Sequence, residues 1–180
     1  MKINKKRFLV AGLIMILGFT AGYAGKRLTR KDSSQVVNTT ASYAFDVSDP
    51  RKLVGWADNV FFGYVDSSAG TLNVGQPVPW SLYKVTVQEN IKGNLPETVT
   101  VGQEGGFSVD KNAMVLLNDD ALLVPGKEYL FVTKADARGW HTLVPAFGDL
   151  PVANSRERRA LSEKFNNAHT KQIPYDPKAF

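Results

Sequence analysis

The side chains that most often carry chemistry are scarce in this sequence of 180 residues. It has no cysteine and only two histidines, His141 and His169. A zinc site needs a third ligand at a compatible spacing, and neither histidine has one nearby in the sequence, so we predict no metal site. The acidic residues between positions 110 and 120 do not follow the spacing of an EF-hand loop. A solvated acidic loop is therefore favoured over a calcium site.

No catalytic arrangement is recognisable in the sequence either. Ser108 lies outside any Gly-x-Ser-x-Gly motif, and no pattern around it assigns a base, so hydrolase chemistry has no support. The glutamates are spread among predicted strand ends and turns, which gives no reason to pair them for glycoside hydrolysis. We therefore predict no enzyme, no catalytic residue and no cofactor. The weakest alternative is an enzyme of unknown type, which would need His141 beside two carboxylates.

Aromatic residues are the better candidates for binding a ligand or partner. Trp80, Phe107 and Trp140 lie at predicted strand ends or in loops, and His141 follows Trp140. Aromatic rings exposed on the open face of a barrel form a binding surface for a ligand or partner. The alternative is that these rings only close the core. We predict Phe107, Trp140, His141 and Trp80 as the ligand- or partner-binding residues.

The formal net charge of +5 hides an uneven distribution of charge. Residues 1–31 contain eight lysines and arginines and no acid. Removing these eight from the total of 22 leaves 14 bases against 17 acids, so residues 32–180 carry a net charge of −3. An acidic body repels phosphate, and we therefore predict that the protein does not bind nucleic acid.

The N-terminal residues 1–31 predict export. A basic start is followed by residues 8–25, a run of 18 residues without a charge. One interpretation is an uncleaved membrane anchor, since about 17–25 apolar residues span a bilayer. The other is a signal peptide cleaved after Ala24, with secretion of the rest. We favour the anchor, and both interpretations place the body of the protein outside the cytoplasmic membrane.

The remaining sequence predicts a mainly β domain with a helix near each end. Asp49 and Pro50 open a short helix, and Asn154 opens an amphipathic helix with a capping-box pattern. Residues 32–44 are predicted to be a flexible linker, residues 45–171 the folded domain, and residues 172–180 a poorly ordered tail. Alternation of apolar residues and turn signals predicts five strands, at residues 60–65, 80–89, 98–101, 129–133 and 140–144.

A set of positions within these strands resembles a known family. The sequence is similar to the OB-fold barrel of tissue inhibitors of metalloproteinases and netrin modules, and more so to exported bacterial proteins that share its strand order. The resemblance implies a five-stranded, Greek-key, partly open barrel. The animal inhibitors chelate zinc through an N-terminal cysteine, which this chain lacks, so that mechanism does not carry over. The matching positions are Ala57, Asp58, Val60, Phe61, Gly63, Val65, Lys92, Gly93, Gly126, Lys127, Tyr129, Leu130 and Phe131.

Together, these observations predict an extracytoplasmic binding module of the cell envelope, tethered to the membrane by residues 8–25. Its partner is expected to be an envelope protein or a glycan. The alternative from another class is a secreted inhibitor of an extracellular hydrolase, which would act by inserting a loop. Residues 102–112 are the predicted loop for that role.

Overall fold

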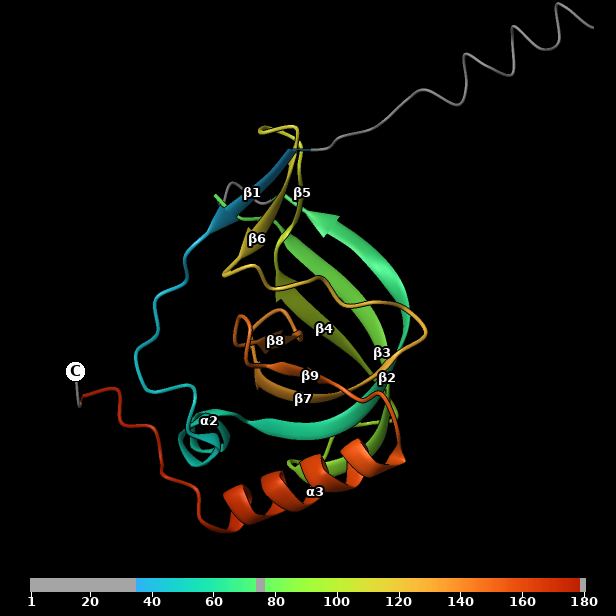
Figure 1. Ribbon diagram of the computed structural model, residues 1–180. Coiled ribbons are helices and arrows are strands. Elements are labelled where there is room, and N and C mark those ends of the chain that lie inside the picture. Colours follow the sequence, from blue (N-terminus) through green and yellow to red (C-terminus); the bar gives the residue numbers. More distant parts are fainter. Residues whose placement is uncertain (1–34, 74–76, 179–180) are drawn as a thin grey trace, which may run out of the picture. The chain divides into compact units, whose positions relative to one another are not determined.

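The structure is a computed structural model that describes residues 35–73 and 77–178 (Figure 1). The predicted signal or anchor helix within residues 1–31 lies outside the described residues. In the part of the chain that is described, neither helix is long and apolar enough to cross a membrane.

Five strands close into a β-barrel, in agreement with the five strands predicted. Around the barrel, β2 pairs with β3, β3 with β4, β4 with β8, β8 with β7, and β7 with β2. Only the β4–β8 pairing is parallel. This order is consistent with an OB-like barrel, although the barrel is closed rather than partly open. The strands are β2 (Asn59–Leu72), β3 (Trp80–Lys92), β4 (Thr98–Glu104), β7 (Glu128–Ala135) and β8 (His141–Leu143).

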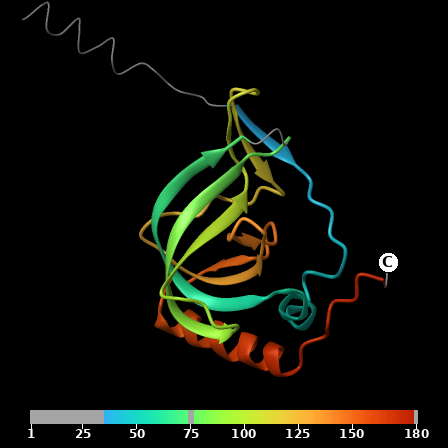
Figure 2. The same cartoon turned by 180° about the vertical axis from the view of Figure 1, so that it is seen from behind.

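Strand β2 is long and bent, and this bend allows the barrel to close. Figure 2 shows β2 and β3 curving together along one side of the barrel. The register between them shifts at four points, one of them between Phe62 and Gly63. A Cβ atom on Gly63 would lie 2.6 Å from Cγ1 of Val85, so the close approach requires glycine. The strand predicted over 60–65 is confirmed but is longer than predicted, because its pairing with β3 continues to Leu72.

Adjacent phenylalanines in β2 contribute to two different cores. Phe61 points into the barrel and stacks on Phe131, with ring centroids 5.1 Å apart. Phe62 points outward and packs beneath the helices with Val54 and Phe165. Complete burial of each such side chain contributes about 1.5–3 kcal/mol. The pair therefore fixes both the barrel interior and the position of the helical layer.

Two helices form that layer, and both begin as predicted. In α2 (Pro50–Trp56), the Asp49 side chain accepts a hydrogen bond from the backbone N–H of Arg51. In α3 (Ser155–Thr170), the Asn154 side chain accepts hydrogen bonds from the backbone N–H groups of residues 156 and 157. Figure 1 shows both helices at one end of the barrel.

A second, three-stranded sheet lies at the other end and has the order β1–β6–β5 (Figure 1). It consists of β1 (Gln35–Thr39), β6 (Ala113–Leu117) and β5 (Gly106–Ser108). The prediction of a flexible linker over 32–44 is therefore wrong for residues 35–39. Their β-branched side chains and parallel pairing with β6 form a strand. The compact unit begins at Gln35 rather than at residue 45.

The C-terminal segment also differs from the prediction of a poorly ordered tail over 172–180. The backbone N–H of Ile173 donates a hydrogen bond to the carbonyl of Arg51, over a distance of 3.1 Å. The ring of Tyr175 lies 5.6 Å from that of Phe45. These contacts fasten the tail to α2. A further short strand that was not predicted, β9 (Asp149–Pro151), pairs with β7.

Candidate functional site

Two of the four predicted site residues come together on the barrel. The ring centroids of Trp80 and Trp140 are 6.3 Å apart. The guanidinium carbon of Arg138 lies 3.9 Å from the Trp140 ring centroid and 5.1 Å from that of Trp80. We call these three side chains the tryptophan platform. Cation–π contacts of this kind favour a cation held over the ring face.

The turn between β7 and β8 holds the platform in place. The carboxylate of Asp136 accepts hydrogen bonds from the backbone N–H groups of Arg138 and Trp140, at 2.9 and 3.0 Å. It also accepts one from Nε of Arg138, at 2.7 Å. Partial burial acts to raise the pKa of Asp136, but these donors lower it overall. The negatively charged carboxylate of Asp136 therefore holds both the backbone turn and the guanidinium of Arg138 in place.

Strand alternation places the platform on the outer face of β3, β4 and β8. Tyr83 and Val85 point into the barrel, so Trp80, an odd number of residues away along a regularly paired strand, points outward. Gly102 of β4 lies beneath the Trp80 ring: a Cβ atom there would lie 3.3 Å from Cε3 of the indole. The glycine thus leaves room for the ring to lie close to the strand.

His141 does not join the platform. It pairs with Val101, a residue of the barrel interior, and so lies on the opposite face from Trp140. Its Nδ1 atom is 3.4 Å from the side-chain nitrogen of Asn59. Burial lowers the pKa of His141, and the negative charges of Asp136 and Asp58 only partly oppose this shift. The shift favours the neutral imidazole, and no hydrogen bond joins the ring to a carboxylate among the described residues.

Phe107 lies on the separate three-stranded sheet and also contributes nothing to the platform. It occupies β5, where it pairs with Met114 of β6. Its side chain is exposed and has no aromatic partner among the described residues. Sequence reasoning thus found two of the three platform residues and missed Arg138. A signal for Arg138 was present in the sequence. Asp136 and Gly139 are typical turn residues, and they predict a turn that places Arg138 close to Trp140.

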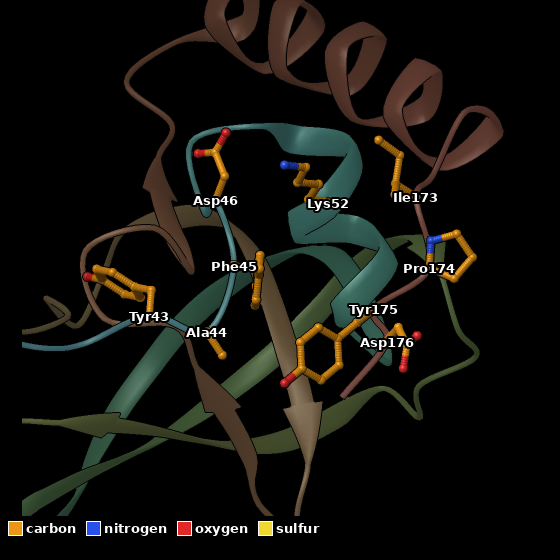
Figure 3. A pocket seen from close by; sticks show the side chains of 9 residues that line it. All are labelled: Tyr43, Ala44, Phe45, Asp46, Lys52, Ile173, Pro174, Tyr175 and Asp176. Atoms are coloured by element: carbon orange, nitrogen blue, oxygen red, sulfur yellow. The ribbon is translucent and has the colours of Figure 1, made fainter. Parts of the chain in front are cut away.

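A groove of about 490 Å³ lies between the segment before α2 and the C-terminal segment (Figure 3). Ligand pockets of this size are common. Phe45 forms its centre, with Asp46 and Lys52 on one side and Tyr175 and Asp176 on the other. Sequence reasoning missed the groove because it predicted a flexible linker up to residue 44 and a poorly ordered tail from residue 172.

The most strongly perturbed acid lies elsewhere, in β9. Burial raises the pKa of Asp149 to about 8, and the negative charge of Asp120 adds to the shift. Burial also raises the pKa of Glu104. Among the described residues, no group of three histidine, aspartate or glutamate side chains is arranged to hold a metal ion.

No protein-family model matches the chain, and a search of curated proteins finds no match. The function is therefore inferred from the geometry of the molecule alone.

Proposed function

We propose that this protein is a non-catalytic binding module of the cell envelope whose ligand binds on the tryptophan platform. Residues 8–25 tether it to the outer side of the cytoplasmic membrane in this proposal, or release it if cleavage follows Ala24. The stacking of Arg138 on Trp80 and Trp140 carries the proposal. A large, partly exposed aromatic surface with a fixed cation is a surface built for recognition.

The position of the platform on the barrel supports this function. The strand order and the single parallel pairing support an OB-like, Greek-key barrel. We propose, from the matching sequence positions alone, that it is related to the metalloproteinase-inhibitor and netrin type. Such barrels bind oligonucleotides and oligosaccharides on their second and third strands and on the loop between the fourth and fifth. The corresponding elements here are β3, β4 and the turn over residues 136–140, which are the elements that carry the platform.

The chemistry of the platform favours an envelope glycan with hydroxyl or carboxylate groups. Both Nε and Nη2 of Arg138 contact Asp136, whereas Nη1 has no protein partner among the described residues. Its two N–H donors are therefore available to a ligand oxygen. The indole rings supply apolar faces beside it. The net charge of −3 on residues 32–180 disfavours nucleic acid.

The test measures co-sedimentation of the full-length chain, in a non-ionic detergent, with insoluble cell-wall glycan. We expect Trp140→Ala to weaken retention at least tenfold, because it removes the ring that covers Arg138 and leaves the cation solvated. Tyr64→Ala is the matched control, since Tyr64 is an exposed aromatic residue on β2 outside the platform. The control should be retained like the unchanged protein.

The outcomes of this experiment distinguish whether the platform is the binding site from whether its ligand is a glycan or a protein. Equal retention of both variants would exclude the platform as the glycan site. If the unchanged protein is not retained but captures an envelope protein that Trp140→Ala does not, the platform stands and the ligand is a protein. Capture that neither substitution affects would contradict the proposal.

A second candidate function, inhibition of an extracellular hydrolase, draws on one observation. The segment predicted for loop insertion, residues 102–112, contains β5 and leads into β6, and the two strands form a hairpin with an exposed tip. Its test is loss of inhibition by Val109→Ser in an assay with envelope hydrolases. The platform is the better supported site because three side chains converge there.

A further inference from the structure

Exposed apolar side chains are concentrated at the end of the molecule that carries the three-stranded sheet. Seven large apolar or aromatic residues in the described part are more than a third exposed. Four of them lie at this end, so their clustering calls for an explanation: Val36 (60% exposed), Leu72 (38%), Phe107 (39%) and Val109 (67%). We call the side chains of Val36, Phe107 and Val109 the apolar tip.

Strand pairing places two of these residues on one face of the sheet. Val36 of β1 pairs with Met114 of β6, which pairs in turn with Phe107 of β5. Directly paired residues point to the same side of a sheet, so the three form an apolar row. Val109 follows at the turn of the hairpin. Leu72 is close by, because Asn73 exchanges hydrogen bonds with the backbone of Phe107 and Val109.

The opposite face of this sheet is already used. Ala113 and Val115 of β6 are completely buried, and Ser108 of β5 is nearly so. A Cβ atom on Gly106 would lie 2.6 Å from Oγ of Ser81, which shows how closely β5 packs on the barrel. The sheet therefore rests on the barrel by one face, and its apolar row faces away without a partner among the described residues.

The sequence before β1 indicates what covers the row. β1 begins at Gln35, which pairs with Ala113 at the base of the hairpin turn, so the chain enters the domain beside the tip (Figure 1). Nine residues separate Gln35 from the uncharged run 8–25. Nine residues span at most about 30 Å when fully extended. A bilayer that holds residues 8–25 is therefore within reach of the tip.

The positive charge of the segment before β1 also favours a position of the domain close to the bilayer. Residues 26–31 contain four bases and no acid. Bases beside a membrane are attracted to anionic headgroups, by about 1 kcal/mol each near the surface. The described domain is acidic, so the basic segment rather than the barrel supplies this attraction. Interfacial binding grows with the apolar area that is buried and with electrostatic attraction to anionic lipids, and the exposed apolar tip and the short basic connection supply one each.

We propose that the outward face of the β1–β6–β5 sheet docks on the bilayer, and that Val36, Phe107 and Val109 insert into its interface. The occupant is the lipid surface of the membrane that holds residues 8–25. This inference rests on the anchor of the proposed function but not on the tryptophan platform. It gives the barrel a fixed orientation, in which the apolar tip faces the lipid and helices α2 and α3 face away from the membrane.

The absence of cysteine allows a direct test, because each introduced cysteine is the only labelling site. The full-length chain is reconstituted in vesicles of phosphatidylethanolamine and phosphatidylglycerol. Fluorescent labels are placed singly at Val109→Cys, at Asn167→Cys on the exposed side of α3, and at Leu17→Cys within the uncharged run. Quenching by lipids that carry a nitroxide on the acyl chain reports insertion.

We expect quenching at positions 17 and 109 and none at 167. Quenching at 17 without quenching at 109 would overturn the docking proposal and leave the anchor intact. No quenching at 17 would overturn the anchor and the docking proposal together, without touching the platform. Self-quenching between labels at 109 that grows with protein density, without quenching by lipid, would assign the tip to a second copy and contradict the proposal. Thermal unfolding of each labelled protein verifies its fold.

Discussion

At the scale of single residues, one carboxylate organises the tryptophan platform. Asp136 binds two backbone N–H groups and the guanidinium of Arg138. Each net hydrogen bond contributes about 1 kcal/mol, and hydrogen bonds to charged groups contribute more. Arg138 is thus held by an ion pair on one side and by ring faces on the other. A ligand that binds there meets a side chain whose conformational entropy has already been lost.

Asp149 gives a prediction at the same scale. The pKa of Asp149 is about 8 in the folded protein and near its ordinary value of 3.8 in the unfolded chain. Between these two pH values the folded state keeps the proton, whereas the unfolded chain has lost it. The stability due to this group is complete below that ordinary value and is lost as the pH rises through about 8. We expect Asp149→Asn to abolish this loss, because the amide stays neutral.

The measurement is denaturant unfolding of the full-length chain in detergent at pH 5 and pH 9. The free energy of unfolding should fall between these values in the unchanged protein by more than in Asp149→Asn. Only the roughly three pH units between pH 5 and the folded pKa of about 8 contribute, so about 1.4 kcal/mol for each unit sets an upper limit of about 4 kcal/mol on the difference. His141 and Glu104 titrate in both proteins and cancel. Parallel pH profiles would show that Asp149 is ionised in the fold.

At the scale of elements, the contact between α2 and the C-terminal segment decides whether the groove exists. Gly55 lies inside α2, where alanine would normally favour the helix by about 1 kcal/mol. A Cβ atom at that position would lie 1.8 Å from the backbone oxygen of Ile173. Lys92 adds to the contact by donating hydrogen bonds to the carbonyl of Val54 and the side chain of Gln172.

We therefore expect Gly55→Ala to destabilise the protein despite the gain in helix propensity. The tail must move away from α2, and its backbone amides should exchange hydrogen faster at residues 173–176. Hydrogen exchange with mass spectrometry measures this change. Lys52→Ala, on the same helix at the rim of the groove, is the control and should leave exchange in the tail unchanged. A stabilised Gly55→Ala with unaltered exchange would mean that the tail does not pack on α2.

At the scale of the whole molecule, the second sheet makes the segment before α2 part of the domain. β1 pairs with β6 over five residues. The hydroxyl of Tyr43 donates a hydrogen bond to the carbonyl of Pro145, and its ring meets Phe147 edge-on at 5.7 Å. These contacts join segments between 78 and 104 residues apart in the sequence.

A truncation series tests this boundary. A chain that begins at residue 35 should unfold in a single transition, at a temperature several degrees above that of a chain that begins at residue 45. The shorter chain loses β1 and Tyr43, and 1 kcal/mol corresponds to about 2–8 °C for domains of this size. Equal unfolding temperatures would support the linker that the sequence predicts over 32–44.

The sequence predicted the barrel and both helices but not the second sheet, the ordered tail or the groove, for physical reasons. Alternation in β3 and the paired phenylalanines of β2 are local signals of a strand buried on one or both faces. The caps of both helices are equally local. β1, the tail and the groove depend on contacts between distant segments, and their polar, proline-containing sequences carry no period of their own. Arg138 was missed for a related reason, since only the closed barrel brings Trp80 beside it.

The parallel pairing of β1 with β6 also has a mechanical consequence. The described domain begins with β1, so any pull on the N-terminal segment enters the fold through Gln35. A pull along the strand loads all the hydrogen bonds of the β1–β6 ladder together, in shear, instead of breaking them one at a time. If the protein is tethered and binds a partner as proposed, lateral motion of that partner relative to the membrane would strain this ladder before it strained the barrel. β1 would yield first and lengthen the tether, and the barrel with its bound ligand would stay folded.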